Sequence, residues 1–127
     1  MTRMIIVLAL FVVATLSGCD FMSHTHCEDK ILVQEKSPDG KYVAILYHRS
    51  CANNTGLYTC VNLQETSETI LSKTETQPVL TMKGVHDVTA VWSGPNSLEI
   101  KSAGLRDRWE VLTQESGWKT VNISYKD

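Results

Sequence analysis

The chain has no excess of basic residues and, after residue 19, no long apolar run. Its 12 Lys and Arg residues stand against 14 Asp and Glu residues, a formal net charge of −2. Nothing in the sequence forms a basic patch, so we expect no nucleic-acid partner. A membrane-spanning helix needs about 20 consecutive apolar residues, and no segment after residue 19 offers them. Internal repeats and sustained low-complexity segments are also missing.

Motifs for catalysis are lacking as well. No serine lies in a nucleophile elbow, and no glycine-rich phosphate loop occurs. His86 and Asp87 have the residue types of a base with its orienting carboxylate. Adjacent residues in a strand point to opposite faces, however, so we interpret this pair as a turn. The sequence predicts a protein that is not an enzyme and that needs no cofactor.

The sequence HTHC, residues 24–27, is a candidate metal site. His24, His26 and Cys27 have the ligand types of a transition-metal site, which His48 or His86 would complete. The two histidines lie in a short polar tether, and Cys27 is better explained as half of a disulfide. We therefore predict no metal ligand here.

The first 19 residues carry the most specific pattern in the chain. A short basic start is followed by the apolar residues 4–16, interrupted only by Thr15, and then by Leu-Ser-Gly-Cys ending at Cys19. These three regions define a secretory signal, and thirteen residues are too few to span a bilayer. Leu-Ser-Gly-Cys resembles the lipobox of bacterial lipoproteins. That resemblance implies a signal peptide over residues 1–18 and lipidation, diacylglycerol and palmitate included, of Cys19.

Lipidation predicts where the protein works. Two or three acyl chains hold a protein on a bilayer almost permanently. Asp20 resembles the signal that retains lipoproteins at the inner membrane of enteric bacteria, so we expect the periplasmic face of that membrane. Residues 19–26 then form the lipidated N-terminus and tether. Residues 27–127 form one domain of ordinary size.

A β-hairpin is the best-defined element of that domain. Two β-prone runs, 31–36 and 41–49, flank Ser-Pro-Asp-Gly, whose residues suit a three-residue hairpin loop with a glycine bulge. Pairing across this loop would place Val33 opposite Ile45 and Glu35 opposite Val43. The resulting alternation predicts a strand pair that is buried on one side.

Three cysteines remain after Cys19, and an exported protein meets an oxidising environment. An odd number allows at most one intramolecular bridge. The hairpin register, extended, places Cys27 opposite Cys51, close enough for a disulfide. Cys51–Cys60 is the rival pair, and the remaining thiol is expected to be buried and inert.

The rest of the domain is predicted as further short strands. The candidates are the ranges 57–63, 78–82, 88–92, 98–101, 109–113 and 118–125. Turn residues predict hairpins between the third and fourth of these ranges and between the last two. Seven or eight short strands without a long helical period predict an all-β domain, a small antiparallel sandwich or curled meander.

Two resemblances bear on this fold. The ranges 37–44 and 91–100 are similar to strand-turn-strand pieces of β-propeller blades, but a propeller needs at least four blades. A cysteine, nine residues, SPDGKYVA and a second cysteine resemble the core of a family of small exported bacterial proteins. This resemblance implies that Cys27 and Cys51 are the bonded pair and implies no activity.

Three functions remain open. The first is a non-enzymatic envelope binding module, for example an immunity or inhibitor protein that binds an incoming toxin or lytic enzyme. The second is an assembly accessory of an envelope complex, and the third is a metal-handling protein. Arg106, Arg108 and Trp109 have a composition typical of protein interfaces, which we interpret here as a solvated turn.

Overall fold

The computed structural model describes residues 27–51, 56–71 and 77–127. The predicted signal peptide, Cys19, Asp20 and the tether lie outside these residues. Within them the chain forms nine strands and one short 3-10 helix, so the all-β prediction is confirmed. The elements are β1 (Cys27–Lys36), β2 (Tyr42–Cys51), β3 (Leu57–Glu65), β4 (Leu80–Lys83), β5 (Thr89–Gly94), β6 (Ser97–Lys101), η3 (Ala103–Arg106), β7 (Val111–Gln114), β8 (Gly117–Trp118) and β9 (Val121–Lys126).

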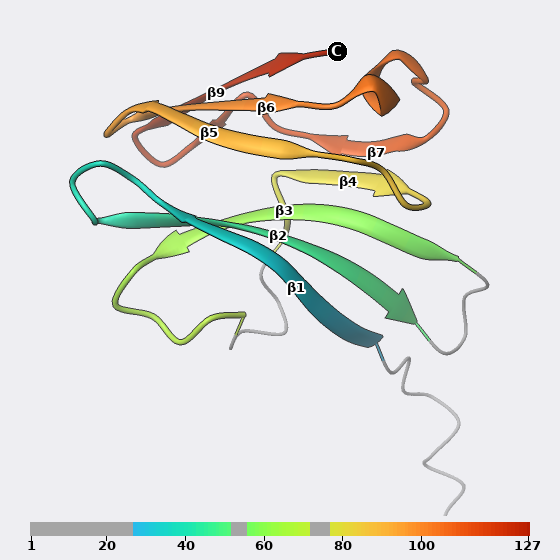
Figure 1. Cartoon of the computed structure of the whole chain (residues 1–127), viewed down its shortest axis with the longest axis horizontal. Coiled ribbons are helices and arrows are strands. Elements are labelled where there is room, and N and C mark those ends of the chain that lie inside the picture. The colour runs from blue at the N-terminus through green and yellow to red at the C-terminus, as the bar shows by residue number, and fades with distance from the viewer. Residues whose placement is uncertain (1–26, 52–55, 72–76) are drawn as a thin grey trace, which may run out of the picture.

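The strands form two sheets that face each other as a small sandwich (Figure 1). The first sheet has the order β1-β2-β3-β4-β7, and the second has the order β5-β6-β9-β8. All neighbours are antiparallel except β6 and β9, which run parallel. The main core lies between the sheets and includes Leu46, Leu63, Met82, Leu98 and Ile100.

The first hairpin forms where predicted, with a different register at its tip. Val33 lies opposite Leu46 and Glu35 opposite Ala44, so the predicted pairs were wrong by one residue. The reason is the loop, which has four residues because Ser37 closes it. The Ser37 amide donates to the Tyr42 carbonyl at 2.8 Å, and the Ser37 hydroxyl accepts from the Tyr42 amide.

A β-bulge between Ile31 and Val33 corrects the register further along the hairpin. The bulge inserts one extra residue into β1, so the shift at the tip is cancelled and Cys27 lies opposite Cys51. The two cysteines form the predicted disulfide, with Cα atoms 4.0 Å apart. The pairing was therefore predicted correctly on a register that holds at only one end of the hairpin.

Strand β2 is buried on both faces, which the prediction of one buried side did not include. Ala44 and Leu46 face the main core, while Ile45 and Tyr47 form a second small core on the outer face of the first sheet. The Gln64 side chain holds the segment 68–71, which covers part of this second core. Its amide donates to the carbonyl oxygens of residues 68 and 69, and its oxygen accepts from the residue 71 amide.

The predicted hairpin between 109–113 and 118–125 was wrong. β7 pairs with β4 in the first sheet, whereas β9 pairs with β6 and β8 in the second. The chain crosses between the sheets at Glu115 and Ser116. Backbone hydrogen bonds hold Glu115 to Val79, just before β4, and Ser116 to Ile123 of β9. Turn chemistry alone cannot distinguish this crossing from a hairpin loop.

Candidate functional site

The two long sides of the sandwich differ. On one side the chain itself joins the sheets between β7 and β8. The Glu115 amide donates to the Val79 carbonyl at 2.8 Å, and the Ile123 amide donates to the Ser116 carbonyl at 2.9 Å. The Tyr125 hydroxyl donates to the Glu115 carbonyl. This side is closed.

On the opposite side lie the two edge strands β1 and β5, one from each sheet. No strand among the described residues pairs with the outer edge of either. One side-chain contact joins them near the hairpin tip, where the Trp92 indole N–H donates to the Glu35 carbonyl at 2.8 Å. The Ser37 amide donates to the Tyr42 carbonyl across the hairpin. Since backbone groups alternate in direction along an antiparallel strand, the backbone groups of Gln34 and Lys36 point to the free edge of β1.

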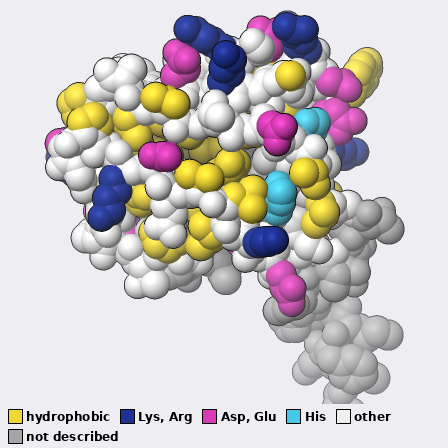
Figure 2. All heavy atoms as spheres, viewed as in Figure 1, with side chains coloured by type: hydrophobic (Ala, Val, Ile, Leu, Met, Phe, Trp, Pro, Cys, Tyr) yellow, Lys and Arg dark blue, Asp and Glu magenta, His cyan; other side chains and the backbone are white. Residues whose placement is uncertain are grey.

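An apolar groove runs between these edge strands, and Figure 2 shows apolar side chains gathered between the two sheets on this face. The larger part of the groove has a volume of about 690 Å³ and the adjoining part about 240 Å³. Val33, Leu46, Val88 and Thr89 line both parts. The groove therefore continues from the Trp92 contact towards the end of the sandwich that carries Cys27.

The bulge in β1 shapes this groove. Leu32 and Val33 are consecutive in sequence, yet both line the larger part. In a regular strand they would point to opposite faces, and a bulge is the usual means of re-aiming a side chain. Each keeps 41% of its surface exposed, so β1 presents two adjacent apolar side chains to the open side.

The end of the groove away from Trp92 carries polar groups. His48 lines it, and its Nε2 atom is buried without a hydrogen-bond partner. His86 also lines it, with Nε2 2.6 Å from the Lys83 carbonyl oxygen. A hydrogen bond to a carbonyl requires a proton on this nitrogen. Gly104 is required here, because a Cβ at that position would collide with the His86 ring and the Met82 methyl group.

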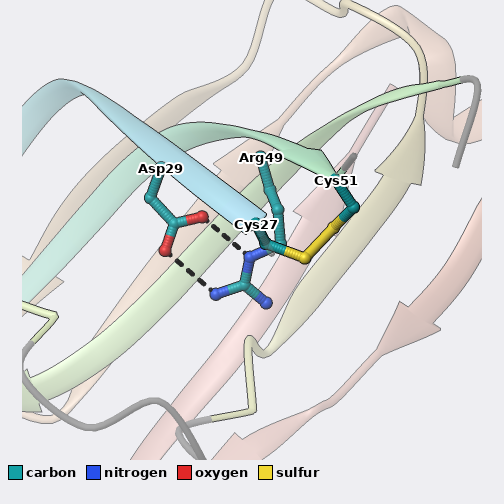
Figure 3. Close-up of polar contacts among 4 residues, drawn as sticks. All are labelled: Cys27, Asp29, Arg49 and Cys51. Atoms are coloured by element: carbon teal, nitrogen blue, oxygen red, sulfur yellow. Dashed lines mark hydrogen bonds and ion pairs between the residues drawn. A yellow bond between two sulfur atoms is a disulfide. The ribbon is translucent and has the colours of Figure 1, made fainter. Parts of the chain in front are cut away.

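The position of β1 is fixed at the Cys27 end by two cross-strand links (Figure 3). Besides the disulfide, Asp29 lies opposite Arg49 and accepts two hydrogen bonds from its guanidinium, at 2.8 and 3.1 Å. The hydrogen bonds to Asp29 raise the pKa of Arg49. Arg49 also lies over the Tyr47 ring at 5.4 Å. With Trp92 at the other end, these contacts hold an edge strand that has a partner on one side only.

Cys60 is free and 1% exposed, as predicted. It lies opposite Tyr47 in the second core. Burial raises the pKa of the Cys60 thiol and also the pKa of Tyr47. Since the thiolate is the reactive form, the environment of Cys60 disfavours reaction.

The remaining sequence predictions fall in different places. Cys19, Asp20, His24 and His26 lie outside the described residues. In the described ranges no group of three or more His, Cys, Asp or Glu residues has an arrangement that could hold a metal ion. No helix there is long and apolar enough to cross a membrane. His86 and Asp87, predicted to form a turn, lie in the irregular segment between β4 and β5, and both line the groove.

The groove was not predicted from the sequence. Its central residues are single apolar side chains in three separate strands or turns, and no motif connects them. One signal was present, because the three apolar residues 31–33 break the alternation expected of a strand with one buried side. Comparisons with family models, with curated proteins and with solved structures find no match to this chain.

Proposed function

We propose that the protein is a lipid-anchored binding module of the bacterial envelope, without enzymatic activity, that takes an extended apolar segment of a partner protein into the groove between β1 and β5. The observation that carries this proposal is the open side of the sandwich. Two edge strands there leave an apolar groove uncovered, while the opposite side is closed by the chain. The partner is a protein of the envelope or one that enters it, such as a toxin or lytic enzyme.

The chemistry of the groove favours an extended peptide. A free strand edge offers backbone donors and acceptors, and a strand added there gains both hydrogen bonds and pockets for alternate side chains. Leu32, Val33 and Val91 offer apolar surface for those side chains. The buried Nε2 of His48 gives one polar atom that a bound segment would satisfy. Burying two or three apolar side chains contributes about 1.5–3 kcal/mol each.

The anchor supplies the other half of the proposal. The Leu-Ser-Gly-Cys sequence supports lipidation of Cys19, and Asp20 supports retention at the periplasmic face of the inner membrane. The anchor would keep the groove near the membrane, where envelope partners pass. Palmitate labelling of cells tests it, with label expected on the wild-type chain and none on Cys19→Ser. An Asp20→Ser variant should move to the outer membrane if Asp20 is the sorting residue.

Site-specific photo-crosslinking in living cells tests the groove. A photoreactive residue at position 33 or 91 should give one discrete protein adduct, identified by mass spectrometry. A photoreactive residue at Leu112, which is exposed on β7 at the closed side, is the matched control and should give none.

The adduct should also depend on the groove surface. Leu32→Asp places a charge on the exposed wall and should reduce the adduct at position 91 by about tenfold or more, because apolar burial is lost and a charge must be desolvated. Equal adducts at positions 91 and 112, or an adduct unaffected by Leu32→Asp, would contradict the proposal. The identified partner then separates capture of an incoming toxin from assembly of an envelope complex.

A further inference from the structure

One end of the sandwich gathers three exposed apolar side chains, Leu57, Val85 and Trp109, of which Val85 also lines the end of the groove. Cys27 marks this end, which we call the tether end, because Cys27 lies eight residues after Cys19. Leu57 pairs with Ser50 at the same end. The Gly84 amide donates to the Leu57 carbonyl, and the Lys83 amide donates to the Glu110 carbonyl. Strands β1, β2, β3, β4 and β7 therefore all have one terminus here, as the right-hand end of Figure 1 shows.

Three exposed apolar residues lie along that edge. Trp109 is 90% exposed, Val85 is 61% exposed and Leu57 is 44% exposed. Trp109 is the most exposed large apolar side chain among the described residues. A tryptophan in water leaves a large apolar surface uncovered, whereas the membrane interface suits both its apolar body and its N–H.

Two arginines, Arg106 and Arg108, shortly precede this tryptophan in the chain. Arg106 pairs with Asp127 at 3.0 Å, while Arg108 makes no ion pair with any described residue. The backbone of Trp109 is held in a turn, since its amide donates to the Asp107 carboxylate at 3.2 Å. The indole and the Arg108 guanidinium thus project from a fixed turn, and a guanidinium binds phosphate oxygens well.

We propose that the turn formed by residues 106–109, with Leu57 and Val85, docks the tether end of the domain onto the bilayer, with Trp109 at the level of the headgroups and Arg108 on lipid phosphates. This inference rests on the proposed anchor at Cys19. Eight extended residues span at most about 29 Å, so the tether end stays within reach of the bilayer. The contact orients the sandwich upright on the membrane, and the hairpin tip points away from it.

Tryptophan quenching tests the proposal on the full lipidated protein. The protein is placed in vesicles of phosphatidylcholine and phosphatidylglycerol whose acyl chains carry bromine, which quenches indole fluorescence at short range. Trp92 and Trp118 lie at the opposite end of the sandwich, since they contact Glu35 and Tyr42 beside the loop of the first hairpin. We expect quenching in the wild type and none in Trp109→Ala, which should fold normally because the side chain is exposed.

The charge of Arg108 provides a second part of the same experiment. A basic residue near an anionic surface contributes roughly a fivefold change in the docking equilibrium, so Arg108→Gln should reduce the ratio of docked to undocked protein by that factor, and only when phosphatidylglycerol is present. Lys41→Gln, an exposed change at the hairpin tip, is the matched control and should have no effect. An unquenched wild type, or quenching that persists in Trp109→Ala, would overturn the proposal.

Whether Cys19 carries the proposed anchor is measured independently of docking. The mass of the purified protein shows whether Cys19 carries lipid, and a chain without lipid is still tested by adding the same vesicles. A photoreactive residue at position 109 gives the last distinction. A lipid adduct supports the proposal, whereas a protein adduct makes this turn a protein interface and refutes it.

Discussion

The closed and open sides of the sandwich are both formed by edge strands, yet they differ in how much apolar surface they leave exposed to water. On the closed side, the chain crosses between the sheets, and the hydroxyl of the partly buried Tyr125 donates to the Glu115 carbonyl. On the open side, the Trp92 indole donates a hydrogen bond to the backbone of β1, and apolar side chains of both edge strands stay exposed. An edge strand with an uncovered apolar surface invites pairing with another chain. This difference is the reason for proposing that a partner binds on the open side.

The disulfide gives the largest expected effect on the open side. Cys27→Ser together with Cys51→Ser should lower the free energy of unfolding by about 3 kcal/mol, because the bridge closes a segment of 24 residues. Denaturant unfolding monitored by circular dichroism measures it. Cys60→Ala is the control and should cost less, since it leaves the bridge intact. A double variant as stable as the wild type would show that β1 is held by its other contacts.

Two matched aromatic changes compare the sides directly. Tyr125→Phe removes the hydrogen bond to Glu115 and should cost about 1–2 kcal/mol, whereas Trp92→Phe removes the bond to Glu35 and should cost about 1 kcal/mol. Hydrogen exchange should locate the losses, with faster exchange in β7 and β9 for Tyr125→Phe and in β1 for Trp92→Phe. Faster exchange throughout the domain in both variants would mean that the two sides do not act independently.

An apolar residue of the groove wall should matter little to stability. Leu32→Ser should change the free energy of unfolding by no more than about 0.5 kcal/mol, because the side chain is already half-exposed. Leu98→Ala, at a fully buried core position, is the contrast and should cost 2–5 kcal/mol, as is typical of such a change. A large loss in Leu32→Ser would make the groove wall a structural element of the core.

The smallest effect concerns pH at the hairpin tip. The Ser37 hydroxyl and the Lys41 amide donate to Asp39 and lower the pKa of Asp39 below its usual value of 3.8. The ionised carboxylate stabilises the fold, so this contribution is present above the ordinary pKa and is lost as the pH falls through the lowered one. The difference in urea midpoint between the wild type and Asp39→Asn should be largest near pH 5 and shrink towards pH 2. A constant difference would contradict the assignment.

Local chemistry made much of the fold predictable. Turn residues located the first hairpin and the β5–β6 hairpin, and hydrophobic alternation located β3. The disulfide followed from the hairpin, although Ser37 lengthened the loop and the bulge corrected the register. The third predicted hairpin failed because residues 114–117 look like a turn whether the next strand joins the same sheet or the opposite one. That choice depends on contacts between β9 and β6, which are distant in sequence.

The groove was less accessible to sequence reasoning for the same reason. Its wall combines Leu32 and Val33 from the bulge with Val88 from the segment before β5 and Leu46 from β2. Each of these residues alone is typical of a core. Only the arrangement of β1 and β5 at the two free edges shows that they surround a space that the described chain leaves open.

Selection of peptides from a random displayed library tests the central claim most directly. The lipidated protein is used as bait, and amide exchange is measured with and without each selected peptide. We predict peptides with alternating apolar residues that slow exchange in β1 and β5 and that bind at least tenfold more weakly to Leu32→Asp. Selected peptides that leave the amides of β1 and β5 unprotected, or that bind Leu32→Asp equally well, would contradict the account.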